Sequence, residues 1–184
     1  MTESSFKNLK TIESKTKRGG NTPLVIGICG GQWGDGGVGK TTVANIIAKS
    51  IGFYPASFVD PVKQLAKEFF GWDGKMDDKA RILLDGVCRV GRRISENYWL
   101  DLTVTRIPKD GTIDKIVFDD VWFPNEAVWI SDCGGVVFMV TRPGHTNPSL
   151  PCETVEISND GSLSSLQHLA PLIIQDELAK RTLR

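Results

Sequence analysis

The sequence predicts an α/β protein in which helices cover both faces of a parallel sheet of about five strands. Three observations support this fold class. Short apolar runs alternate with longer segments of helical periodicity, the first run leads into a glycine-rich loop, and a helical segment follows that loop. With 184 residues the chain has the length of one domain, which we expect at residues 23–184 after a flexible polar leader at residues 1–22.

The glycine-rich loop carries the strongest signal for function. Residues 34–41 fit the pattern G-x-x-x-x-G-K-[ST] of a phosphate-binding loop, between an apolar strand at 24–29 and a helix that starts near Lys40. Glycines let backbone N–H groups turn inward, and the helix directs its positive end to the same point. We therefore expect ATP and Mg²⁺ there, with Lys40 on the β- and γ-phosphates and Thr41 on the metal. The expected nucleotide-binding residues are Gly34, Asp35, Gly36, Gly37, Val38, Gly39, Lys40, Thr41 and Thr42.

The remaining elements complete the predicted three-layer α/β/α arrangement of P-loop NTPases. In chain order they are a strand at 53–59, helices at 61–70, 79–94 and 98–107, a strand at 113–118, a helix at 124–132, strands at 136–140 and 155–157, and a closing helix at 163–178. We expect Asp60 to cap the second helix and Pro171 to interrupt or bend the last one. Residues 142–153 are rich in proline and polar residues and predict a lid loop.

Polar residues follow the predicted strands, and in a parallel sheet ligands bind beyond the carboxyl ends of the strands. Asp119 and Asp120 follow the third strand, and we favour Asp120 as the carboxylate that serves Mg²⁺. The alternative is that these carboxylates only cap the next helix. Arg142 follows the fourth strand and is expected to stabilise charge on the transferred phosphoryl group. Lys40, Asp120 and Arg142 are thus the expected catalytic residues.

A basic patch and several aromatic residues are candidates for binding the second substrate. The patch consists of Arg81, Arg89, Arg92 and Arg93, and the aromatic residues are Trp72, Trp99, Trp122 and Phe123. Guanidinium groups suit a second phosphate, and aromatic rings suit stacking on a base. The alternative interpretations are a solvated helix face for the arginines and the apolar core for the aromatic residues.

Composition excludes several classes of partner. Lys plus Arg and Asp plus Glu both total 22, so no excess charge indicates nucleic acid or a membrane surface. The four cysteines lack zinc-site spacing, and we interpret them as reduced thiols. No secretory signal or long apolar span is evident, which predicts a cytoplasmic protein. The oligomeric state stays open, with a homodimer as one option.

Several segments beyond the phosphate loop carry a family resemblance. They are residues 58–63, 81–84, 91–92, 98–99, 120–127, 142–144 and 159–163. Together they resemble the phage deoxynucleoside monophosphate kinases, over residues 24–170. The resemblance implies transfer of the γ-phosphate of ATP to a deoxynucleoside 5′-monophosphate, in the host cytoplasm if the protein is phage-encoded. It also implies that the monophosphate site is lined by Asp60, Lys63, Arg81, Arg92, Trp99 and Asn125.

The chain departs from the family at two places and leaves other functions open. Trp122 stands where the family has an arginine, so that contact is lost or is supplied by Arg89 or Arg93, and the phosphate loop is longer. One alternative is a small-molecule kinase similar to dephospho-coenzyme A kinase. Another is a switch or partitioning ATPase, although Asp35 occupies the position of the second lysine in those loops. A third is a kinase-like binding protein without turnover.

Overall fold

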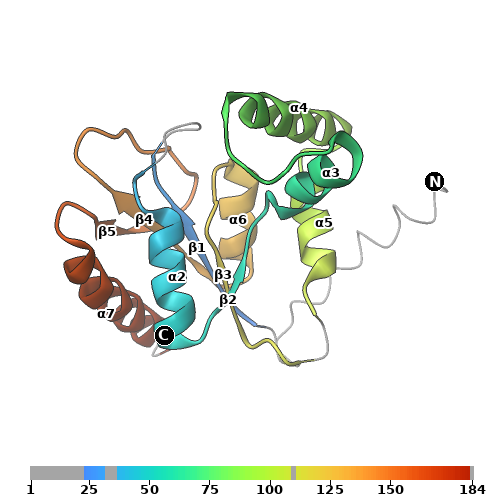
Figure 1. Cartoon of the computed structure of the whole chain (residues 1–184). Coiled ribbons are helices and arrows are strands. Elements are labelled where there is room, and N and C mark those ends of the chain that lie inside the picture. Colours follow the sequence, from blue (N-terminus) through green and yellow to red (C-terminus); the bar gives the residue numbers. More distant parts are fainter. Residues whose placement is uncertain (1–22, 32–36, 109–110, 183–184) are drawn as a thin grey trace.

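A computed structural model describes residues 23–31, 37–108 and 111–182, and Figure 1 shows its central sheet with helices on both sides. Five parallel strands pair in the order β2-β3-β1-β4-β5, which confirms the predicted fold class. The strands are β1 (Leu24–Cys29), β2 (Tyr54–Ala56), β3 (Lys115–Phe118), β4 (Val136–Thr141) and β5 (Thr154–Ser158). The helices are α2 (Lys40–Ile51), α3 (Asp60–Phe70), α4 (Asp78–Ile94), α5 (Tyr98–Arg106), α6 (Pro124–Asp132) and α7 (Leu163–Thr182).

Alternating residues of β1 divide the core between the two faces of the sheet. Ile26 and Ile28 pack with α2 and α7, whereas Val25 and Cys29 pack with α5 and α6. This alternation is the period-2 pattern of a strand that is buried on both sides. β1 is the middle strand of the sheet, so the glycine-rich loop that follows it starts between the two layers of helices.

Two elements differ from the sequence-based expectation. β2 is limited to Tyr54–Ala56, because the backbone N–H groups of Phe58 and Val59 donate to the Asp120 carboxylate and are no longer part of the strand. α7 runs through Pro171 as far as Thr182, so the proline does not interrupt the helix, which was one of the two expected outcomes. Residues on both sides of the proline, among them Leu166 and Ile174, are buried in one core cluster, and this packing offsets the hydrogen bond that a proline removes from a helix.

The helices α3, α4 and α5 form a small subdomain with its own core. Val62 and Ala66 of α3 pack there against Leu84 and Val87 of α4 and Trp99 of α5. In Figure 1 this unit lies beside the carboxyl ends of β1 and β3, where it forms one wall of the candidate site. In the part of the chain that the structure describes, no helix has the length and apolar character needed to cross a membrane.

Candidate active site

The amino end of α2 forms the described part of the phosphate loop. The helix starts at Lys40, and its N-cap Gly39 has a φ of 102°, a left-handed conformation that favours glycine. The first N–H groups of a helix have no acceptor within the helix, and the helix dipole places positive charge at the same end. The predicted nucleotide-binding residues Gly34, Asp35 and Gly36 lie outside the described residues.

The connections that follow β4 and β5 hold the phosphate loop in place. The Asn147 side-chain oxygen accepts a hydrogen bond from the Gly31 N–H (3.2 Å), and the Asn159 amide donates to the Val38 carbonyl (2.7 Å). Arg142 donates to the Gly37 carbonyl. Neither asparagine was predicted as a site residue. Asn159 directly follows β5. The rule that ligands bind beyond the carboxyl ends of strands would have identified Asn159 as a site residue if it had been applied to the fifth strand as well.

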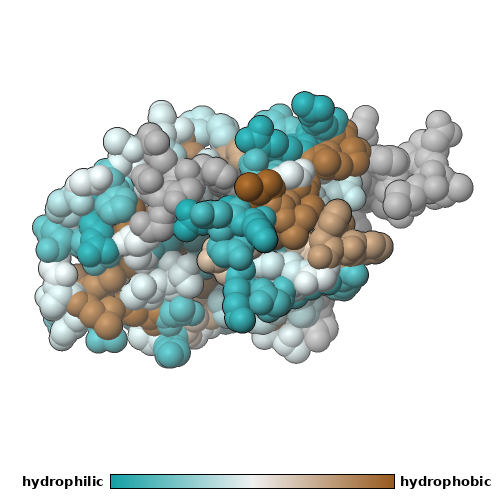
Figure 2. Space-filling model, turned by 45° about the horizontal axis from the view of Figure 1, so that its top comes forward, coloured by the Kyte–Doolittle hydropathy of each residue, from teal (hydrophilic) through white to brown (hydrophobic). Residues whose placement is uncertain are grey.

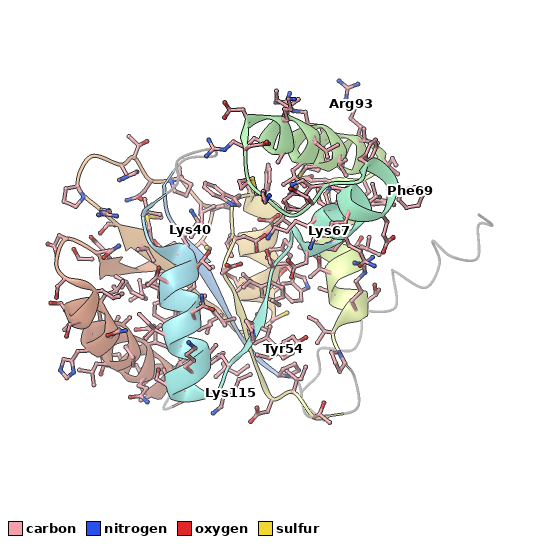
Figure 3. The ribbon with its side chains drawn as sticks, viewed as in Figure 1. Lys40, Tyr54, Lys67, Phe69, Arg93 and Lys115 are labelled. Carbon is pink, nitrogen blue, oxygen red and sulfur yellow. The ribbon has the colours of Figure 1, made fainter. Side chains whose placement is uncertain are left out.

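Lys40 connects the phosphate loop to the residues after β3. Its Nζ donates to the Gly30 carbonyl (2.7 Å) and lies 4.0 Å from the centroid of the Trp122 ring. Figure 3 shows this lysine at the end of α2 that faces the loop. A cation over an indole face is a favourable contact, so Trp122 packs against Lys40 and joins the residues after β3 to the phosphate loop.

The two adjacent aspartates after β3 have different surroundings. The Asp119 Oδ2 accepts a hydrogen bond from the Thr41 hydroxyl (2.9 Å). The Asp120 carboxylate instead accepts hydrogen bonds from the Ser57 hydroxyl (2.7 Å) and from the N–H groups of Phe58 and Val59 (both 2.8 Å). Asp120 therefore ties the start of α3 to β3, and Asp119 is the carboxylate beside the predicted metal ligand Thr41. Neither aspartate caps α6, whose N-cap is Phe123.

Several carboxylates at this edge perturb one another. Burial and the charges of Asp119 and Glu126 raise the pKa of Asp120 to about 7, and the hydrogen bonds from Ser57 and the Phe58 N–H act against this rise. Burial also raises the pKa of Asp60, and Asp119 adds to that shift. The negative charges of Asp60 and Asp119 are thus close enough to repel each other. The hydrogen-bond partner of Asp119 is the Thr41 hydroxyl.

Asp60 does not have the capping role that the sequence suggested. It is the first residue of α3, Val59 is the N-cap, and no side chain caps the helix. The Asp60 carboxylate lies 3.7 Å from the Nζ of Lys63, one turn further along α3. Because Pro61 lacks an N–H group and fits the first turn, the helix starts here without a side-chain cap.

The oxygen ligands at this edge suit a hard divalent cation. Among the described residues no three His, Cys, Asp or Glu side chains come together as a metal cluster. Mg²⁺ commonly uses one or two carboxylates and takes its other ligands from water and substrate phosphates. The pair formed by Thr41 and Asp119 fits that pattern.

A pocket of about 530 Å³ lies between α4 and the segment that joins β3 to α6. Its lining residues are Gly31, Asp85, Cys88, Arg89, Arg92, Trp122, Phe123 and Pro148. The sequence predicted four of these as candidates for binding the second substrate, namely Arg89, Arg92, Trp122 and Phe123. The pocket combines guanidinium groups with aromatic rings and reaches Gly31 at the phosphate loop.

Arg92, which lines this pocket, forms an ion pair with the buried Glu126. The Arg92 Nη2 lies 2.7 Å from the Glu126 Oε1, and the guanidinium carbon lies 3.3 Å from the centroid of the Phe123 ring. The other Glu126 oxygen accepts hydrogen bonds from the N–H groups of Trp122 (2.9 Å) and Phe123 (3.0 Å). Glu126 is 2% exposed, and burial raises its pKa while these partners oppose the rise. Sequence reasoning assigned Glu126 no role.

Three predicted substrate residues, Arg81, Arg89 and Asn125, lie on α4 and α6. Arg89 forms an ion pair with Asp85 (2.8 Å), and Arg81 is exposed one turn before Asp85 on the same side of α4. The Asn125 amide binds the Glu96 carbonyl (3.1 Å) and therefore fastens α6 to the turn between α4 and α5.

Trp99 and Arg93 also lie away from the pocket. Trp99 is in the core of the α3–α4–α5 unit, where its indole N–H donates to the Cys88 carbonyl (2.8 Å). The structure thus places Trp99 outside the pocket, because its ring fills the space against Gly91. Arg93 is exposed and points away from the molecule in Figure 3.

Comparisons with known proteins give one relative by sequence. The chain is 28% identical over 158 residues to a protein of Acanthamoeba polyphaga mimivirus named "Putative deoxynucleotide monophosphate kinase", and the match covers 68% of this chain and 80% of that protein. This name agrees with the family that the sequence resembles. No protein-family profile matches the chain.

Two of the solved structures to which the chain is similar are described as kinases. One is a "putative kinase" from Chloroflexus aurantiacus, with a TM-score of 0.46, 11% identity, and coverage of 86% of this chain and 99% of that chain. Another is a gluconokinase from Sinorhizobium meliloti, with a TM-score of 0.46, 14% identity, and coverage of 88% and 97%. A likeness at these levels does not identify a substrate.

Proposed function

We propose that the protein is a nucleotide kinase that transfers the γ-phosphate of ATP to a nucleoside 5′-monophosphate, with deoxynucleotides as the favoured acceptors. The observation that carries the proposal is that two sites meet at Trp122. Lys40 of the phosphate loop lies over Trp122, and Trp122 also lines the pocket with Arg89 and Arg92. A donor phosphate at Lys40 and an acceptor phosphate at the two arginines would therefore both lie beside Trp122 and be neighbours. The name of the viral relative supports the same acceptor class.

On the donor side, the phosphates of ATP would accept hydrogen bonds from the N–H groups at the start of α2. Lys40 would exchange its bond with the Gly30 carbonyl for bonds with the β- and γ-phosphates. Thr41 and Asp119 would hold Mg²⁺, which neutralises charge on these phosphates. In this proposal Asp120 has a positioning role, because its three hydrogen bonds fix the segment between β2 and α3.

On the acceptor side, the pocket of about 530 Å³ has the size of small-molecule sites. Guanidinium groups bind phosphate oxygens in pairs, so Arg89 and Arg92 are the proposed ligands of the monophosphate. One face of Phe123 is covered by Arg92 and one face of Trp122 by Lys40, so only the remaining ring surfaces would contact a base. Asp60, Lys63 and Arg81 would complete the rim, as the family resemblance implies.

The reaction would be direct transfer without a covalent intermediate on the protein. An oxygen of the acceptor monophosphate forms a bond to the γ-phosphorus while the bond to the ADP oxygen breaks, and the products are ADP and a nucleoside diphosphate. Arg142 reaches the loop residue Gly37 from the lid segment. From this position it is the proposed group that stabilises negative charge on the phosphoryl group during transfer.

The experiment that tests the proposal measures ADP release with the four common deoxynucleoside monophosphates, their ribose counterparts and dephospho-coenzyme A. We expect Mg²⁺-dependent ADP release with one or a few deoxynucleotides. Lys40→Ala should abolish it, and His168→Ala is a matched control because His168 lies on an exposed face of α7. ATP binding without ADP release for any acceptor would refute the proposal and favour a binding protein. Activity with dephospho-coenzyme A alone would favour the other kinase class.

A further inference from the structure

Helix α4 has an apolar stripe that the fold leaves uncovered. Ile82, Gly86, Val90 and Ile94 recur every four residues, and the three large side chains are 74%, 63% and 62% exposed. Other apolar residues of α4 already pack in the α3–α4–α5 core. A surface helix normally buries its apolar face and exposes polar residues. α4 therefore has one apolar face in the core and a second one at the surface.

The stripe lines one side of an apolar groove. The groove has a volume of about 480 Å³, and Leu65 and Phe70 of α3 and Tyr98 and Trp99 of α5 line it together with α4. Phe69, the neighbour of Phe70, is 75% exposed. Figure 2 shows hydrophobic side chains gathered over this part of the surface, and Figure 3 shows Phe69 pointing outward from α3.

The exposed apolar area is large for a monomer. Phe69, Phe70 and the three large residues of the α4 stripe expose roughly 600 Å² together, if a fully exposed large apolar side chain has about 150–200 Å². The largest patch of a typical monomer is roughly 300–600 Å² in all. A stable interface buries about 800 Å² on each partner, and in homodimers its core is the more apolar part. The five apolar side chains on α3 and α4 would thus supply about three quarters of one side of such an interface.

We propose that this face joins two copies of the chain into a homodimer, with the two α4 helices antiparallel across a two-fold axis at Gly86. The stripe is symmetric about that residue, because Ile82 precedes it and Val90 follows it by four positions. Each Ile82 would then contact the Val90 of the second copy, as a two-fold interface requires. A Cβ atom at Gly86 would meet nothing within 4 Å, so the helix backbone is open to close approach there. Antiparallel helices also place opposite dipole ends together.

The dimer contact leaves the candidate active site open. Asp85, Cys88, Arg89 and Arg92 face the pocket from the other side of α4, and none of the stripe residues Ile82, Val90 or Ile94 lines it. Pairing of the helices would brace α4 and with it the arginines of the pocket. The dimer does not depend on the kinase reaction, so each can be tested without the other.

The first test is the mass of the full chain by sedimentation velocity. We expect twice the 20.2 kDa of one chain. Ile82→Glu or Val90→Glu should weaken dimerisation at least about 30-fold, because each places a charge at the centre of an apolar interface. Both side chains are exposed, so the melting temperature of the monomer should be kept. Leu172→Glu on α7, where Leu172 is 51% exposed, is the matched control and should remain dimeric.

The second test locates the axis. Gly86→Cys should form a disulfide-linked dimer under mild oxidation, and Leu172→Cys should not. A monomeric wild type at about 100 μM would overturn the proposal and point to residues 1–22 or a different protein as the occupant of the groove. A dimer that survives both glutamate variants would overturn it as well. Loss of the dimer in these variants without cross-linking of Gly86→Cys would exclude an axis at Gly86.

Discussion

Glu126→Ala is expected to lower the free energy of unfolding by about 3–5 kcal/mol. The change removes the partner of a partly buried Arg92 guanidinium, 2.7 Å away, and the acceptor of two backbone N–H groups at Trp122 and Phe123. Breaking one side of a buried ion pair leaves the other charge uncompensated, which is the largest part of the cost. The two N–H groups account for about 1 kcal/mol each of this loss if they stay unpaired. For a chain of this length we expect the melting temperature to fall by roughly 10 °C.

The assay is urea unfolding of the full chain at pH 7, followed by tryptophan fluorescence and circular dichroism. A double-mutant cycle with Arg92→Met isolates the ion pair. The double variant should be less destabilised than the sum of the two single variants by about 1–3 kcal/mol, because neither charge is then left buried alone. Asp176→Ala is the matched control, since Asp176 forms an i,i+4 pair with Lys180 on α7 in which both side chains are more than half exposed. A loss below about 1 kcal/mol for Glu126→Ala, or additive single effects, would refute this reasoning.

Three further predictions concern the aspartates and the lid. Asp119→Asn should raise the Mg²⁺ concentration for half-maximal ADP release at least about tenfold, because it replaces the carboxylate beside Thr41 with a neutral amide. If only Asp120→Asn raised that concentration, Asp120 and not Asp119 would be the metal ligand. The pKa of Asp120 is raised from 3.8 to about 7, so the folded state binds the extra proton between these values and the stability from this group is lost as pH rises through 7. Urea unfolding at pH 5 and pH 8 should therefore show a steeper loss for the wild type than for Asp120→Asn, and equal slopes would contradict the shift. Arg142→Ala should lower kcat at least about 100-fold with little change in the KM for ATP, and turnover within about twofold of the wild type would rule out its role in transfer.

The order of the helices and strands was predictable because residues that start or end an element mark its bounds in the sequence. Pro61 and Gly71 enclose α3, and the apolar run that forms β1 leads directly into the glycine-rich loop. The extent of β2 was not predictable. Its apolar run continues to Val59, but the backbone there binds a carboxylate that is 61 residues away in the sequence. A long-range partner of this kind leaves no local pattern.

Which of Asp119 and Asp120 lies beside Thr41 depends on the face of the sheet to which each side chain belongs. Val117 packs in the core with α2, and Phe118 packs in the core with α5 and α6. Since side chains alternate along a strand, Asp119 continues the α2 side, where Thr41 lies. The sequence shows the alternation but does not show which face α2 covers, so it supported the two residues nearly equally. The same limit applies to Trp99, whose ring packs against α4 in the core of the α3–α4–α5 unit.

The most direct test of the proposed kinase reaction follows the labelled γ-phosphate of ATP. The purified chain is incubated with γ-labelled ATP, Mg²⁺ and each deoxynucleoside monophosphate, and the products are separated by chromatography. We predict that label appears in a deoxynucleoside diphosphate, in equal amount to the ADP formed, and that Lys40→Ala forms none. Label that appears only in inorganic phosphate, at a rate that no acceptor changes, would contradict the kinase reaction and identify an ATPase.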